Sequence, residues 1–128
     1  MIPTRYDPSR SPDAGGWLAL SEDERIRMAE EFHRGARIRV PNLHVHAVMH
    51  VIVENQLALG SELPVAGTLA RLVREGLSRH DAVHAIGSVL LVHMKRLAGG
   101  AAPGEDPHEP YYAELARLTP RRWREQFG

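Results

Sequence analysis

The segment LHVHAVMHVIVENQLAL, residues Leu43 to Leu59, decides what kind of fold this chain can form. It is apolar on nearly every side, and Glu54 is its only side chain expected to be ionised at pH 7. Asn42, just before it, is a suitable helix N-cap, and Gly60 follows its end as a typical helix stop. A helix that is apolar nearly all round is usually central and buried. The segment therefore predicts a buried central helix.

Capping signals predict further helices on both sides of this segment. Ser21 and Glu24 have the spacing of a capping box, and Ser78 stands three residues before Asp81 in the same way. A shorter helix is expected between Pro64 and Gly76, with proline in its first turn and glycine at its end. No pair of strands is indicated. The fold class expected is all-α, a compact bundle of about four main helices with an irregular N-terminal arm and a short helical C-terminal tail.

The length of 128 residues suits a single domain made of successive segments. Prolines and a Gly-Gly pair near the start predict an irregular arm, and a stretch rich in Gly and Pro near residue 100 predicts a linker. The predicted division is an arm at residues 1–20, a helical bundle at 21–98, a linker at 99–110 and a helical tail at 111–128 that packs on the bundle.

Composition excludes several classes of function. Lys and Arg together number 16, as do Asp and Glu, so the chain lacks the basic excess of a dedicated nucleic-acid binder. There is no cysteine, which excludes disulfides, thiolate metal sites and a cysteine nucleophile. No signal-peptide core or apolar run of transmembrane length is present, so we expect a cytoplasmic protein that does not enter a membrane. Histidine, with 8 residues, is the one type in clear excess.

The histidines of the central segment form a stripe with helical spacing. His46, His50 and Glu54 follow one another at intervals of four residues, which places them on one face of a helix. His80 and His84 repeat this spacing on the later predicted helix. If the two helices pack together, four imidazoles and a carboxylate converge.

A divalent transition metal would satisfy such a set of buried polar groups. Neutral imidazole suits zinc, iron and nickel, and a carboxylate adds an oxygen ligand. We therefore predict a mononuclear site with His46, His50, His80, His84 and Glu54 as the metal ligands. Glu54 is also the candidate catalytic residue, acting as a general base on metal-bound water. The hypothesis is a small metal-binding protein that is either an enzyme using metal-activated water or dioxygen or a binder without catalysis.

A metal-free interpretation stands beside this one. The same side chains could form a hydrogen-bond network in the core of a non-catalytic interaction or scaffold module. The remaining histidines are expected to lie elsewhere. His44 should point away from the stripe, His93 should be a surface or packing residue, and His33 and His108 should face solvent.

Two segments, PNLHVHAVMHVIVENQ and GLSRHDAVHAIGSVL, resemble a family of small bacterial helical proteins known as a domain of unknown function. The resemblance covers residues 41–97 and rests on two His-x-x-x-His pairs, an asparagine before the first, and a glutamate and a glutamine after it. These positions are Asn42, His46, His50, Glu54, Gln56, His80 and His84. The resemblance implies a helical fold with a histidine-rich centre, and it implies no reaction.

Partners and chemistry are less constrained. There is no His-Glu-x-x-His motif, no phosphate-binding glycine loop and no nucleophile elbow, so no substrate class is indicated. The tail combines Arg121, Arg122 and Arg124 with Trp123, and we interpret it as a helix that packs its aromatic residues rather than as a docking patch. A homodimer is expected from the aliphatic composition, and nucleic acid is an unexpected partner.

Overall fold

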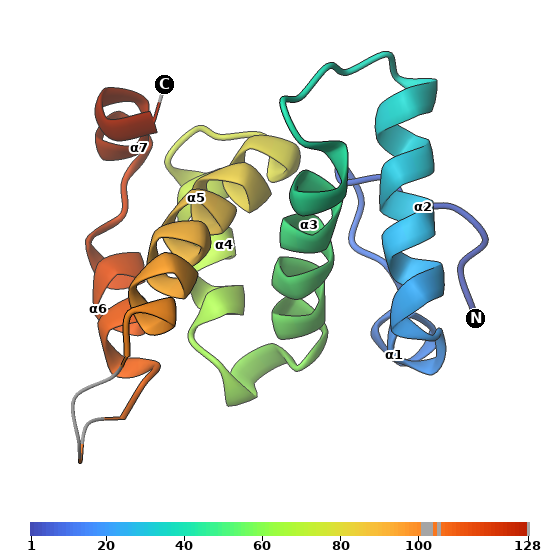
Figure 1. Cartoon of the computed structure of the whole chain (residues 1–128). Coiled ribbons are helices and arrows are strands. Elements are labelled where there is room, and N and C mark those ends of the chain that lie inside the picture. The colour runs from blue at the N-terminus through green and yellow to red at the C-terminus, as the bar shows by residue number, and fades with distance from the viewer. Residues whose placement is uncertain (101–103, 105, 128) are drawn as a thin grey trace. The chain divides into compact units, whose positions relative to one another are not determined.

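A computed structural model describes residues 1–100, 104 and 106–127 of the chain. Over these ranges the backbone forms seven α-helices and no strand, which confirms the predicted all-α fold class (Figure 1). Part of the predicted linker, at residues 101–103 and 105, lies outside the described residues. The helices are α1 (Ala14–Ala19), α2 (Glu22–Gly35), α3 (Leu43–Ala58), α4 (Val65–Arg74), α5 (Arg79–Ala98), α6 (Glu109–Arg117) and α7 (Pro120–Phe127).

The chain divides into two compact units, residues 1–63 and residues 64–128. This boundary falls inside the segment predicted as one bundle, after the short 3-10 turn Gly60–Glu62 that ends α3. The first unit holds α1, α2 and α3, and the second holds α4 to α7. The segment predicted as an irregular arm contains the six-residue helix α1, which Asp13 caps by accepting a hydrogen bond from the backbone of Gly16.

The first unit is built on α3, along which α2 packs (Figure 1). Both predicted caps are present: Ser21 and Glu24 form the capping box of α2, and Asn42 accepts a hydrogen bond from the Val45 backbone at the start of α3. Residues of the arm, α1, α2 and α3 share one apolar core, to which the arm and α1 contribute aromatic rings and α2 and α3 contribute small or aliphatic side chains. That core consists of Tyr6, Trp17, Leu20, Met28, Ala29, Ala47 and Val51.

Arg25 of α2 fastens the arm to the helices of the first unit. Its guanidinium donates to the backbone carbonyl oxygens of Trp17, Leu18 and Leu20 at 2.8–2.9 Å. It also donates to Oδ1 of Asn55 on α3 at 3.1 Å, an atom that accepts a second hydrogen bond from the Trp17 indole at 2.9 Å. One side chain thus satisfies the carbonyl groups at the end of α1 and ties them to both longer helices.

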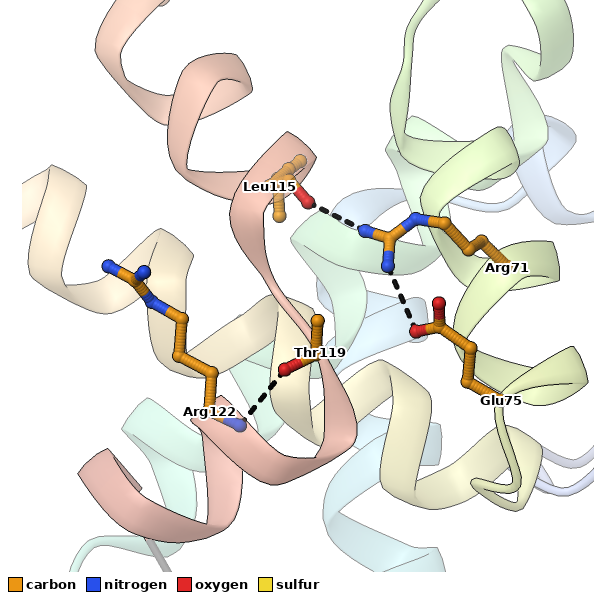
Figure 2. A network of polar contacts seen from close by, with 5 residues as sticks. All are labelled: Arg71, Glu75, Leu115, Thr119 and Arg122. Carbon is orange, nitrogen blue, oxygen red and sulfur yellow. Dashed lines mark hydrogen bonds and ion pairs between the residues drawn. The ribbon is translucent and has the colours of Figure 1, made fainter.

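The second unit is built on α5, against which α4, α6 and α7 pack. Ser78 caps α5 as predicted, accepting a hydrogen bond from the backbone of Asp81. Arg71 on α4 donates to the carbonyl oxygen of Leu115 near the end of α6 at 3.0 Å, and Glu75 accepts from the same guanidinium at 3.0 Å (Figure 2). The Leu115 carbonyl also accepts from the Leu118 backbone N–H at 3.2 Å, so Arg71 adds a second, charged donor at the end of α6.

The tail consists of α6 and α7, separated where Leu118 is buried and extended. Thr119 accepts a hydrogen bond from the backbone of Arg122 and so caps α7 (Figure 2). The Trp123 indole donates to the Ser88 hydroxyl on α5 at 3.4 Å, whereas Phe127 is 41% exposed. Packing of the tail therefore uses Trp123 as expected, and Phe127 remains largely at the surface.

Within the part of the chain that the structure describes, no helix is long and apolar enough to cross a membrane.

The Arg25 contacts lead to a stability prediction. Replacement by methionine leaves several carbonyl groups at the end of α1 without their charged donor, so Arg25→Met should lower the free energy of unfolding by about 2–4 kcal/mol. Arg27→Met is the matched control, because Arg27 lies exposed on the same helix and forms a surface ion pair with Glu31 at 2.9 Å. It should change stability by less than about 0.5 kcal/mol. Urea denaturation measures both, and equal effects would contradict this role of Arg25.

Candidate metal centre

A buried hydrogen-bonded triad occupies the centre of the first unit. The Tyr6 hydroxyl donates to Oε2 of Glu54 at 2.7 Å and lies 2.9 Å from Nδ1 of His50. The two α3 residues are one helical turn apart, and Tyr6 reaches them from the irregular segment before α1. All three side chains are at most 4% exposed. A carboxylate this deep needs a donor, and the tyrosine supplies one.

The triad fixes the proton on the His50 ring. A tyrosine hydroxyl has one proton, and here it is donated to Glu54. The hydroxyl oxygen can therefore only accept from Nδ1–H of His50. The neutral imidazole then carries its lone pair on Nε2, the atom that can bind a metal.

His33, the last-turn histidine of α2, is held in the same tautomer. Its Nδ1 lies 2.7 Å from the carbonyl oxygen of Ala29, one turn earlier on the helix. A carbonyl only accepts, so Nδ1 is the donor and Nε2 again carries the lone pair. His33 is 0% exposed, and its ring centroid lies 4.8 Å from that of His50. Two imidazoles from different helices thus meet in the first unit with their Nε2 atoms prepared as ligands.

His46 completes a group of three imidazoles in the first unit. Its ring centroid lies 4.6 Å from that of His33 and 4.9 Å from that of His50. The predicted His46/His50 pairing on one face of α3 is therefore present. Phe32 packs edge-on against His33, with ring centroids 5.2 Å apart.

The second unit contributes the other predicted pair. His80 and His84 lie in the first two turns of α5, with ring centroids 4.4 Å apart. Both are partly buried. The Ser78 cap begins the helix just before them, and so sets the register that places both imidazoles on one face.

The described side chains that could hold a metal ion form a set of histidines: His33 and His50 in the first unit, and His80 and His84 in the second. Three of them were predicted ligands. Glu54, also a predicted ligand and the candidate general base, is not in the set, because its carboxylate is placed on the Tyr6 hydroxyl. His46 is not in the set either, although it lies beside two members.

The burial of the other four histidines tests where the sequence expected each of them to lie. The expectation that His33 faces solvent was wrong, because it is fully buried in contact with His46 and His50. His44 and His108 are exposed, as expected. His93 is buried and stacks on Tyr111, which makes it the packing residue that was one of its two expected roles.

Tyr6 and His33 are the residues that sequence reasoning missed. His33 lies four residues after the buried Ala29, on the inward side of α2, and this spacing could have identified it. Its charged neighbours concealed the signal. Tyr6 is separated from His50 by 44 residues and lies outside any helix, so no periodicity points to it.

A cavity of about 430 Å³ lies beside the triad in the first unit. Its walls include the rings of Tyr6 and Phe32 together with Met28 and the end of α2 at Gly35. These two rings also contact the histidines, since Tyr6 packs edge-on against His50 at 5.7 Å. A small molecule in this cavity would therefore be separated from the imidazoles of His50 and His33 by the rings of Tyr6 and Phe32.

Comparison with protein-family models, with curated proteins and with solved structures gave no match to this chain. The functional interpretation therefore rests on the geometry of the histidines and of the side chains that orient them.

The triad gives a direct test of its structural role. Tyr6→Phe removes one hydroxyl and leaves Nδ1–H of His50 and the Glu54 carboxylate without it, so the free energy of unfolding should fall by about 1–3 kcal/mol. Tyr112→Phe is the matched control, because Tyr112 lies half-buried on α6 and should cost less than about 0.5 kcal/mol. Chemical denaturation followed by circular dichroism measures both. A neutral Tyr6→Phe variant would contradict the role given to the hydroxyl.

Proposed function

We propose that this protein binds one divalent transition metal ion through histidine imidazoles. In the first unit the candidate ligands are the oriented rings of His33 and His50, and in the second unit they are His80 and His84.

The observation that carries the proposal is the fixed tautomer of His33 and His50. Each ring donates Nδ1–H, one to the Ala29 carbonyl and one to the Tyr6 hydroxyl. Histidines that bind metals characteristically donate their other ring N–H to a carbonyl or to a carboxylate-linked group, which fixes the ring and raises its basicity. This arrangement places the lone pair of each ring on Nε2, which is the atom that a metal would bind.

Glu54 orients a ligand in this proposal instead of binding the ion. Its carboxylate draws the Tyr6 proton toward Oε2, and the Tyr6 oxygen in turn accepts from His50. The chain Glu54–Tyr6–His50 extends the familiar carboxylate–histidine arrangement by one hydroxyl. Glu54 is therefore a positioning residue for His50.

The donor set indicates the class of metal. Imidazole nitrogen suits zinc, iron and nickel, and four such donors complete the tetrahedral coordination of a structural zinc site. A set of three with an open position is the arrangement of catalytic zinc, where the ion acts as a Lewis acid on bound water. We favour a site whose protein ligands are all imidazoles, because the one carboxylate of α3 is engaged with Tyr6.

Metal analysis of protein purified without a histidine tag tests the proposal. We expect about one equivalent of metal per chain, and a melting temperature that rises when zinc is restored to metal-stripped protein. His50→Ala should abolish both effects. His44→Ala is the matched control, since His44 is exposed on the same helix and its variant should bind normally. Metal content near zero together with an unchanged melting temperature would contradict metal binding.

A second substitution separates the two roles considered for Glu54. Glu54→Gln keeps an oxygen that can accept from Tyr6 but removes the carboxylate charge, so the variant should retain full metal stoichiometry with an affinity lowered about 10–100-fold. Zinc titration against a competing chelator measures both quantities. Loss of stoichiometry would instead make Glu54 a direct ligand.

The alternative function is a metal-free scaffold whose histidines and Glu54 only hold the core together. The Tyr6 triad favours it in one respect, since these hydrogen bonds already satisfy Glu54 and one nitrogen of His50. In that case His50→Ala should destabilise the protein equally with and without added zinc.

A cytoplasmic location, a homodimer and the resemblance to the bacterial domain of unknown function remain predictions from the sequence.

A further inference from the structure

A second cavity lies entirely within the second unit, and none of its lining residues is a histidine of the metal proposal. Its volume is about 310 Å³, and it opens among α5, α6 and α7. Apolar walls come from Val89, Val92 and Phe127, and polar groups come from His93 and Arg96. A space of this size can accommodate a small organic molecule.

One hydrogen bond between the two polar residues of this cavity determines which ring nitrogen of His93 carries the proton. Arg96 donates to Nδ1 of His93 at 2.6 Å, and since a guanidinium only donates, Nδ1 must be the acceptor. The neutral ring therefore carries its proton on Nε2. Burial and the nearby charges of Arg96 and His108 lower the pKa of His93, which keeps the ring neutral at pH 7.

His93 thus presents a buried donor that lacks an acceptor. The side chain is 3% exposed, and Nε2 makes no hydrogen bond within the described ranges of the chain. Its ring stacks on Tyr111 at 5.3 Å with an angle of 18° between the planes, so the ring orientation is fixed. Leaving a donor buried in this way is costly, and an acceptor brought into the cavity would remove the cost.

The charges around the cavity favour an anion with a single charge. Arg96 is the cation at its wall, and Glu114 is the acid. Glu114 is already engaged by two cations, Arg117 at 3.4 Å and Arg122 at 3.6 Å. Arg96 therefore sets the sign of the charge that the cavity accepts, and one guanidinium beside one neutral imidazole matches a carboxylate better than a dianionic phosphate.

From these contacts we propose that the cavity among α5, α6 and α7 binds a small monocarboxylate with an apolar body. The carboxylate accepts from Arg96 and from Nε2–H of His93, while the body packs between Val92 and Phe127. This proposal does not depend on metal binding, since neither the cavity nor its donors include a predicted metal ligand.

Benzoate is the probe for the experiment, with benzyl alcohol as its uncharged counterpart. Calorimetric titration of the full chain should show benzoate binding that is at least about tenfold tighter than benzyl alcohol binding. Arg96→Met should weaken benzoate binding at least about tenfold, and His93→Phe should weaken it several-fold while keeping an aromatic ring on Tyr111. Lys95→Met is the matched control, because it removes the same charge from the adjacent residue, which does not line the cavity.

Three outcomes would overturn the proposal: no benzoate binding, equal affinity for benzoate and benzyl alcohol, or equal weakening by Arg96→Met and Lys95→Met. Arg96 is exposed, so its variant should fold even if His93→Phe does not. Metal-stripped protein should bind benzoate as well as untreated protein does, which keeps this test separate from the test of the metal site.

Discussion

The buried Tyr6 hydroxyl is the interaction on which the first unit depends. A helix as apolar as α3 cannot carry an imidazole and a carboxylate at successive turns unless something donates to one and accepts from the other. A hydroxyl can do both at once, and Tyr6 is placed to do so by the core that its ring shares with Trp17 and Phe32. The apolar packing of the arm therefore determines the protonation of a histidine in the centre of the unit.

The same logic explains why the arm must be held closely. Tyr6 lies in irregular backbone, which has no helical hydrogen bonds to keep it in position. Two contacts hold this segment. The Tyr6 ring packs against the Trp17 ring, and the Arg25 guanidinium donates to three carbonyl groups around the end of α1. The Arg25 contacts thus help to maintain the hydrogen bonds that Tyr6 makes with His50 and Glu54. We infer that substitutions at Arg25 act on the histidines as well as on stability.

Sequence reasoning predicted the helices well because their signals are local. The caps at Ser21, Asn42 and Ser78 lie within three residues of the groups they bind, and the spacing of His46, His50, His80 and His84 follows from the helical repeat. The orienting contacts could not be predicted in this way. The hydrogen bond from Tyr6 to Glu54 spans 48 residues, and the short helix α1 begins in a segment whose prolines and glycines indicate irregular structure. Such contacts arise from packing, which periodicity does not encode.

The two sets of histidines illustrate how one residue type takes opposite roles through its neighbours. In His33 and His50 an acceptor stands at Nδ1, so each ring offers a lone pair at Nε2 and suits a cation. In His93 a guanidinium donor stands at Nδ1, so the ring offers a proton at Nε2 and suits an anion. Burial alone does not distinguish these cases, since all three rings are at most 3% exposed. The atom opposite Nδ1 decides the chemistry, and this is why the excess of histidine in the sequence corresponds to two different kinds of site.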